Sequence, residues 1–231
     1  MIRLPPLIAH RCGGERAPEN TLAGLRAAAR AGCGAVEFDV MLSADGTPVL
    51  IHDETLERTT NGVGRVCETP DAVLFALDAG GGERIPTLAA AAALCHRHGL
   101  LANIEIKPAH GHEAATGERV ARFVQQHWQG GAPLLSSFSA SALQAAWRVA
   151  PTLQYGLLFE TVPADWQRQR EAIGAVTLHC AAAAVRDDVL AEARAAGVPV
   201  LCYTVNDAEA ARRLFARGVS SVFSDRIDLL D

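Results

Sequence analysis

Several features that define common protein classes are missing from this sequence of 231 residues. No segment approaches about 18 uninterrupted apolar residues, so we expect no membrane-spanning helix and no stable membrane insertion. Lys and Arg together number 21 against 26 acidic residues, and they form no basic cluster of the kind that follows nucleic acid phosphates. A nucleic acid partner is therefore not expected. A small anionic substrate is compatible with the net charge of −5, because a local site can be positive on an acidic protein.

Cysteine pairs with metal-binding or redox spacing are also absent. The six cysteines contain no C-x-x-C pair, which argues against zinc ribbons and disulfide frameworks and favours a reducing compartment. The opening MIRLPPLIAH lacks the apolar core of roughly 7–15 residues that a secretion signal needs. We therefore predict a soluble, cytoplasmic protein.

Lysine is almost absent, since Lys107 is the only one and every other residue of the Lys/Arg total is arginine. It lies in NIEIKP (103–108), two residues after Glu105 in an apolar, strand-like run. An ammonium is a compact point donor whereas a guanidinium is a planar fork, so the two are not interchangeable. This single exception, beside a carboxylate on one face of a strand, indicates a chemical role for Lys107.

Short apolar runs alternate with Ala- and Arg-rich helical stretches along the chain. Helices are predicted, for example, over 20–32, 87–99 and 207–218, each ending at a glycine. Continuously apolar strands between helices are typical of a covered parallel sheet, and eight such units close a (β/α)₈ TIM barrel. An open doubly wound sheet is the alternative, although it usually has fewer strands. We predict one α/β TIM-barrel domain over 1–231, with strands at 7–10, 35–40, 100–106, 133–138, 154–159, 175–180, 198–205 and 220–225.

One interval departs from this alternation. More than forty residues separate the second strand from the helix that begins at Thr87. They include an additional strand-like segment, VLIHD (49–53), and the Gly- and Thr-rich segment TTNGVGRV. We predict a small insertion of about residues 53–86 after strand two, long enough to be functional.

Acidic residues are expected to gather at the mouth of this barrel, where the C-terminal ends of the strands converge. Residues two apart share a strand face, so Glu37 and Asp39 lie on one face, as do Glu105 and Lys107. Carboxylates about 4 Å apart repel by roughly 4 kcal/mol per pair at an effective dielectric of about 20. Such a cluster must be partly protonated or hold a cation, and all-oxygen ligands suit Mg²⁺ or Ca²⁺ far better than zinc. We predict that Glu37, Asp39 and Glu105 bind one divalent cation.

Histidines and cations complete the predicted site. His10 and His52 titrate near neutrality and are candidates for the general acid and base. Arg11 and Lys107 add positive charge to a mouth that already holds a cation, a combination that suits a phosphate ligand. The later strands add Ser137, Asn206, Asp225 and His179, the last a weaker site candidate, and the histidines expected at the surface are His96, His98, His110, His112 and His127.

These residues stand in motifs that resemble the glycerophosphodiester phosphodiesterase family, in particular its short cytoplasmic bacterial members. The motifs cover nearly the whole chain in the family's order: HRCGGERAPENT (10–21), EFDV (37–40), DGTPVLIHDETLERTTNGVGRV (45–66), ERIPTL (83–88), IEIKP (104–108), SSF (136–138), YTVN (203–206) and VFSDRIDLL (222–230).

The resemblance implies a TIM barrel with an insertion after strand two and metal-dependent hydrolysis of glycerophosphodiesters to glycerol 3-phosphate and an alcohol. It also implies residue roles: His10 and His52 as the acid/base pair, Glu37, Asp39 and Glu105 as metal ligands, and Arg11 and Lys107 as phosphate ligands, with Glu19 near the phosphate site. The first nucleophile, water or the neighbouring glycerol hydroxyl, stays open. Which histidine is the base also stays open, and His52 as the acid toward the leaving alcohol is a weaker guess.

Few positions depart from the family's pattern. Cys12 stands where the family usually has Gly, and it costs about 1 kcal/mol or more if the backbone there needs a positive φ. Tyr203 replaces a frequent Trp and Ser224 a frequent Thr, without loss of aromatic or hydroxyl character. Two other functions are compatible with such a barrel: a phospholipase or lyase acting on lipid head groups, and a non-catalytic barrel that binds a phosphorylated metabolite.

Overall fold

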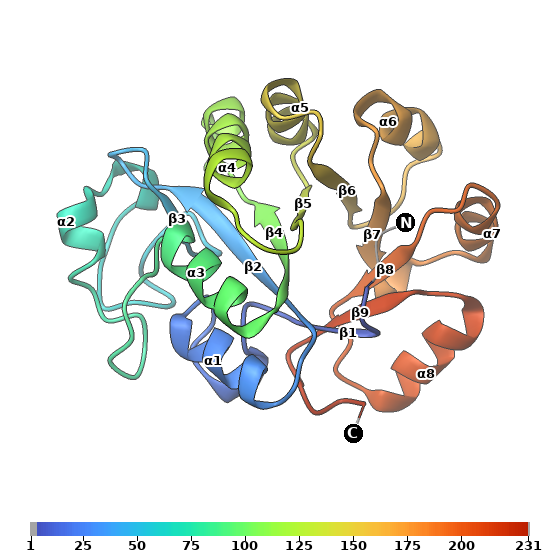
Figure 1. Ribbon diagram of the computed structural model, residues 1–231, viewed down its shortest axis with the longest axis horizontal. Coiled ribbons are helices and arrows are strands. Elements are labelled where there is room, and N and C mark those ends of the chain that lie inside the picture. Colours follow the sequence, from blue (N-terminus) through green and yellow to red (C-terminus); the bar gives the residue numbers. More distant parts are fainter. Residues whose placement is uncertain (1–3, 231) are drawn as a thin grey trace.

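A closed ring of eight parallel strands forms the centre of the computed structural model, which describes residues 4–230 (Figure 1). Each strand pairs with the next around the ring, and the pairing of β1 with β2, Ala9 opposite Val36, closes it. This closure confirms the predicted TIM barrel and excludes the open doubly wound sheet. The strands of the ring are β1 (Leu7–Ala9), β2 (Ala35–Leu42), β4 (Leu101–Ile106), β5 (Leu134–Ser137), β6 (Gln154–Phe159), β7 (Thr177–Ala181), β8 (Val200–Tyr203) and β9 (Ser221–Ser224).

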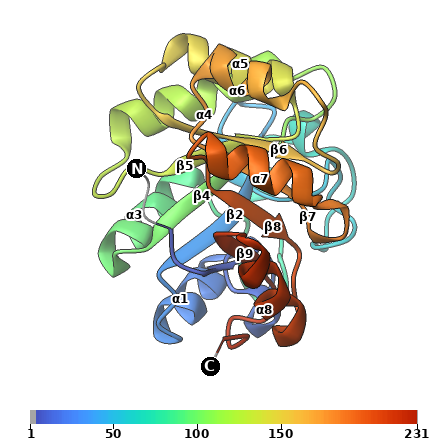
Figure 2. The same cartoon turned by 90° about the vertical axis from the view of Figure 1, so that its right-hand side faces the viewer.

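Helices surround this ring (Figures 1 and 2). Several of the predicted cap residues begin and end helices in the structure. The side chains of Thr21 and Asp207 cap the first turns of α1 and α8. Gly99 and Gly218, both with left-handed backbone, end α3 and α8. The helices of eight or more residues in the described chain are α1 (Leu22–Arg30), α3 (Leu88–His98), α4 (Glu113–His127), α5 (Ala140–Val149), α6 (Trp166–Ile173), α7 (Asp187–Ala195) and α8 (Ala208–Arg217).

Strand β2 shows how the barrel divides its residues between two environments. Val36, Phe38 and Val40 are buried in the large hydrophobic cluster that also includes residues of the surrounding helices. The alternate residues Glu37 and Asp39 face the inside of the ring, because successive side chains of a strand point to opposite faces. A small separate cluster of Ile8, Ala35, Leu201 and Phe223 fills part of the barrel interior.

The segment after β2 lies beside the barrel and has a core of its own, and it begins near Pro48, before the predicted bounds of about 53–86. Strand β3 (Pro48–Leu50) pairs antiparallel with the end of β2, outside the ring, and the short helix α2 (Asp71–Leu74) follows it (Figure 1). Its buried side chains form a separate cluster that includes Val49, Leu56, Val66 and Leu74. Short 3₁₀ turns lie at Gly14–Arg16, Val66–Glu68 and Ala182–Ala184. The single-domain assignment stays a prediction, and residues 1–3 and 231 at its ends lie outside the described residues.

Among residues 4–230 no two cysteines form a disulfide bond. Within the same range, no helix has the length and hydropathy that crossing a membrane requires.

Helices α4 and α5 pack closely through a glycine in the middle of α4. A Cβ atom at Gly117 would lie 2.1 Å from the carbonyl oxygen of Ala142. Gly117→Ala therefore forces the two helices apart, and although alanine favours a helix by about 1 kcal/mol, we expect a net loss of about 1–3 kcal/mol in the free energy of unfolding. Urea denaturation measures the change.

Gly131→Ala is the matched control, because no atom lies within 4 Å of its added Cβ. It should unfold at the wild-type urea concentration or slightly above it. A Gly117→Ala protein as stable as the wild type would contradict this account of the packing.

Candidate active site

A cavity of about 240 Å³ opens at the C-terminal ends of the strands. Glu19, one of the predicted site residues, does not line this cavity. Its carboxylate contacts Arg11 from outside the cavity. Ser137, Asn206 and Asp225 do not line this cavity either. The cavity is lined by His10, Arg11, Glu37, Asp39, His52, Asn103, Glu105, Lys107, Phe138, Leu158, His179, Tyr203, Thr204 and Phe223.

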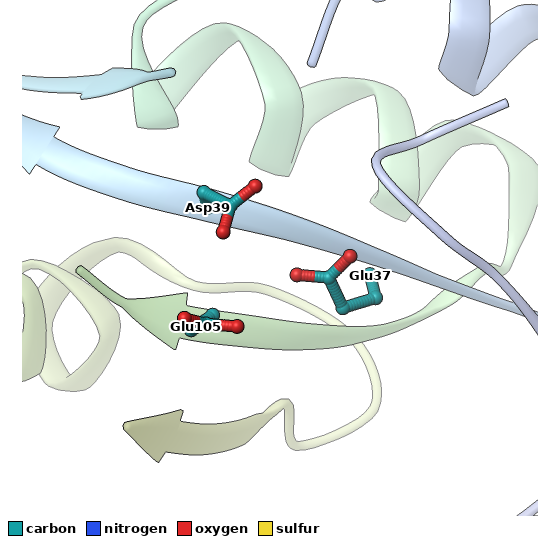
Figure 3. A group of neighbouring side chains, drawn as sticks. All are labelled: Glu37, Asp39 and Glu105. Atoms are coloured by element: carbon teal, nitrogen blue, oxygen red, sulfur yellow. The ribbon is translucent and has the colours of Figure 1, made fainter. Parts of the chain in front are cut away.

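The three predicted metal ligands lie together on adjacent strands (Figure 3). Asp39 on β2 is in register with Glu105 on β4, and one oxygen of each of the three carboxylates lies within 4.8 Å of the others. Hydrogen bonds hold them in place: Asn20 Nδ2 donates to Asp39 Oδ2 (2.9 Å), and the amide of Arg11 donates to Glu37 Oε2 (2.9 Å). Glu37 Oε1 is buried without any hydrogen-bond partner.

This arrangement raises the pKa of two of the three carboxyl groups. Burial, together with the charge of Asp39, raises the pKa of Glu37 well above its usual value. The same two causes raise the pKa of Glu105 to about 7, although Lys107 opposes the shift. Three converging carboxylates, one with an unpartnered buried oxygen, fit a hard divalent cation, which would satisfy that oxygen and offset the repulsion.

Each of the two candidate acid/base histidines is oriented by a carboxylate. His10 Nδ1 lies 2.7 Å from Asp225 Oδ1, which leaves Nε2 facing Glu37 Oε2 at 3.9 Å. His52 Nδ1 lies 2.6 Å from Asp53 Oδ1, and its Nε2 lies 2.7 Å from Lys107 Nζ. A lysine ammonium only donates, so Nε2 accepts and the His52 proton is on Nδ1. Burial, with the charges of Lys107 and Arg11, lowers the pKa of His52 despite nearby Asp39 and Asp53.

Lys107 places one nitrogen among three partners. Besides His52, its Nζ lies 3.3 Å from Glu105 Oε1 and 3.5 Å from Asp39 Oδ1. Burial alone would lower the pKa of Lys107, but the charges of Asp39 and Glu105 raise it above its usual value. Three contacts converging on a single atom suit a tetrahedral ammonium and not a planar guanidinium, which accounts for the only lysine in the chain.

A chain of ion pairs connects the insertion to the barrel. Glu19 accepts from Arg11 Nη1 (3.1 Å) and from both Nη atoms of Arg58 (2.8 Å each). Arg58 also donates to both carboxylate oxygens of Asp53, the partner of His52. Despite partial burial, these hydrogen bonds lower the pKa of Glu19. Arg58 thus holds the carboxylate behind Arg11 and the carboxylate behind His52 at the same time.

Several of these supporting residues were missed in the sequence. Asp53 directly follows His52, and Arg58 stands in the same DETLERTTNG segment, so their proximity in the chain was a usable signal. Asp225 was noted only as a strand-end residue. Its pairing with His10 joins positions 215 residues apart, which no local pattern reveals.

The loop after His10 has the left-handed backbone that makes Cys12 unusual. Arg11 and Cys12 have φ values of 48° and 78°, and the Cys12 side chain is fully buried. Gly24 of α1 makes room for it, since a Cβ at Gly24 would lie 2.9 Å from Cys12 Cβ. This turn lets the Arg11 amide reach Glu37.

Known proteins share both the sequence pattern and the fold. The Glycerophosphoryl diester phosphodiesterase family matches residues 10–229. A glycerophosphodiester phosphodiesterase of Caldanaerobacter subterraneus is 31% identical over 226 residues, which cover 95% of this chain and 93% of that protein. Human glycerophosphodiester phosphodiesterase 1 is 42% identical over 116 residues, 46% of this chain and 35% of the human protein.

Among solved structures, an Oleispira antarctica phosphodiesterase in complex with the product sn-glycerol-3-phosphate matches with a TM-score of 0.93 and 40% sequence identity. The match covers 96% of this chain and 93% of that chain. Fold and sequence together place the protein among the TIM-barrel hydrolases. The chain belongs to the glycerophosphoryl diester phosphodiesterase family.

Cation binding should depend on pH because Glu105 must lose a proton first. In the cation-free protein this carboxyl has a pKa of about 7, raised above its usual 4.5, so the folded state holds a proton that the unfolded chain has lost. The stability that this protonated carboxyl contributes to the folded state is therefore lost as pH rises from 4.5 through about 7. A cation that replaces the proton should bind about tenfold more tightly at pH 8 than at pH 6. Calorimetric titration with Mg²⁺ measures both affinities and the proton released.

The control for this prediction is Glu118→Gln, which removes an exposed carboxylate of α4 and should keep the wild-type pH dependence. Glu105→Gln should weaken binding at both pH values and reduce the difference between them. Equal wild-type affinity at pH 6 and pH 8 would contradict the assignment.

Arg58 should matter for turnover although it does not line the cavity. In Arg58→Met, Asp53 and Glu19 lose their shared partner, so His52 and Arg11 are less well oriented. We expect a fall in kcat of about 10–100-fold, because small misplacements of reacting groups have effects of this size. Arg65→Met is a matched control, since Arg65 lies in the same insertion and pairs with Glu54 and Glu68, neither of which lines the cavity. A wild-type kcat in Arg58→Met would show that the network is not needed.

Proposed function

We propose that this protein hydrolyses small glycerophosphodiesters, such as glycerophosphocholine or glycerophosphoethanolamine, to glycerol 3-phosphate and an alcohol, with one divalent cation. Family membership supports the reaction class. The observation that carries the proposal is the convergence of three carboxylates, two carboxylate-oriented histidines and two basic side chains on one cavity. A water-soluble substrate and a cytoplasmic location belong to the same proposal.

Glu37, Asp39 and Glu105 are the proposed cation ligands, and their oxygens suit Mg²⁺ or Ca²⁺ alike. When bound, the cation supplies positive charge to the non-bridging oxygens of the phosphodiester as negative charge develops there. The carboxylates provide the rigid frame, because all three are on strands and two of them are almost completely buried.

Arg11 and Lys107 are the proposed phosphate ligands. Glu19 holds the Arg11 guanidinium at the edge of the cavity, and Lys107 is already placed between the carboxylates and His52. An incoming phosphate oxygen offers Lys107 a stronger, charged acceptor than a neutral imidazole. Transfer of that contact to the substrate frees His52 Nε2 to take a proton.

This exchange favours His52 as the general base. Its pKa is lowered, so the imidazole is neutral near pH 7, as a base must be before the reaction. His10, whose Nδ1 faces the carboxylate of Asp225, is then the general acid that protonates the leaving alkoxide. The assignment reverses the weaker guess made from the sequence, and it serves attack by water or by the neighbouring glycerol hydroxyl.

The two other candidate functions are less well supported. A lipid head-group enzyme needs an apolar rim around the mouth. Of the large hydrophobic side chains that are exposed in residues 4–230, namely Val63, Val73, Phe138 and Leu230, Phe138 alone lines the cavity. A non-catalytic metabolite-binding barrel has no need of two oriented histidines beside a carboxylate cluster.

The test is a steady-state assay of the purified protein with glycerophosphocholine, glycerophosphoethanolamine, phosphatidylcholine and sphingomyelin. We expect release of glycerol 3-phosphate from the water-soluble diesters, loss of activity with a chelator and recovery with Mg²⁺ or Ca²⁺. Turnover of the intact lipids alone would favour the head-group enzyme, and no turnover of any diester would favour the binding protein.

His10→Ala and His52→Ala should each fold normally and lose about 10²–10⁴-fold in kcat, the usual contribution of one acid or base. In the wild-type pH–rate profile, the fall in kcat at acidic pH should follow the titration of His52, because a protonated base cannot accept a proton. His127→Ala, at an exposed position of α4, is the control and should keep full activity. Near-wild-type turnover in either active-site variant would remove that histidine from the mechanism.

A further inference from the structure

Unpartnered buried polar atoms are concentrated in the cavity. Among residues 4–230, seven buried side-chain nitrogen or oxygen atoms have no hydrogen-bond partner, and four of these belong to residues that line it. Two of the four, Arg11 Nε and Glu37 Oε1, belong to the proposed phosphate and cation sites. The other two, Asn103 Oδ1 and His179 Nδ1, have no role in the mechanism described so far.

Asn103 lies one layer deeper in the barrel than Asp39 and Glu105, at the level of Glu37. It precedes Glu105 by two residues on β4 and is in register with Glu37 on β2. Its Nδ2 donates to Ser136 Oγ (3.1 Å), and the side-chain oxygen is left over. The residue is 4% exposed, so bulk water contributes little to satisfying that oxygen.

His179 lies on β7, three strands from the β4 strand of Asn103 around the ring of eight, and it lines the cavity from a different wall. Its ring is completely buried, packs against Phe223 and lies over Gly156, where a Cβ would come within 2.8 Å of Nε2. Nε2 lies 2.9 Å from Thr177 Oγ1, so the ring orientation is held and Nδ1 is left over. Burial lowers the pKa of His179 to about 3, which makes the ring neutral.

The two walls thus each present one unused neutral polar atom, next to the apolar side chains of Leu158 and Phe223. A buried polar group without a partner costs about 1–3 kcal/mol, so a ligand that offers hydroxyl groups gains by completing both. A choline head group carries no N–H or O–H, so it forms no hydrogen bond with either atom. The mouth of the cavity is open to solvent, in contrast to these buried walls, since its side chain Phe138 is 49% exposed.

We propose that Asn103 and His179 form a polyol subsite that binds the hydroxyl groups of the glycerol arm, while the variable alcohol arm points outward past Phe138. Such a subsite makes binding depend on the glycerol arm and not on the alcohol arm. It rests on the proposed phosphodiesterase function, whose site it extends inward.

The test compares two phosphate monoesters that differ only in the hydroxyl groups. Calorimetry with Mg²⁺ present gives the affinity of sn-glycerol 3-phosphate and of n-propyl phosphate for each protein. We expect the wild type to prefer glycerol 3-phosphate by at least tenfold, and His179→Phe and Asn103→Leu each to reduce this ratio several-fold. His179→Asn, which keeps a polar atom near the position of Nδ1, should recover part of the preference.

Ser221→Ala is the matched control, because Ser221 is equally buried on β9 but its hydroxyl already donates to the carbonyl of Pro5. It should keep the wild-type ratio. A misfolded variant loses affinity for both esters, so the ratio reports the subsite and not stability. An unchanged ratio in the folded variants, or a wild type that does not distinguish the two esters, would overturn the proposal. The comparison needs binding alone, so its failure is separate from a failure to hydrolyse glycerophosphodiesters.

Discussion

The repulsion among Glu37, Asp39 and Glu105 is the constraint to which the rest of the site responds. Two parallel strands in register bring these carboxylates together inside the barrel. Burial, together with this repulsion, raises the pKa values of Glu37 and Glu105. Positive and donor groups gather around them for the same reason: Lys107, Arg11 and the amide of Asn20.

The insertion takes part in the site through charge and not through its own hydrophobic core. Arg58 links Glu19, behind Arg11, to Asp53, behind His52, so one guanidinium supports both edges of the cavity. A planar fork with five donors suits this bridging position, whereas Lys107 occupies a position where several acceptors meet at one point. The two kinds of cation are therefore distributed according to the geometry of their partners.

Much of the fold and part of the site could be predicted from the sequence. The ring strands and the capped helices follow local periodicity and cap residues, which depend on neighbours in the chain. The carboxylates and the lysine were found because strand alternation places residues two apart on one face. The pairing of Asp225 with His10 and the unpartnered atoms of Asn103 and His179 were beyond this reasoning, because they depend on strands distant in sequence and on the register of the closed ring.

The sequence by itself determined which chemical groups are available and on which face of each strand they lie, since both depend on residue type and a period of two. Only the tertiary structure decided which groups meet. Closure of the ring sets the distances between carboxylates on different strands, leaves particular buried atoms without partners and brings an arginine of the insertion behind His52. These are properties of strand register and packing, which arise from contacts summed over the whole barrel and have no local signature.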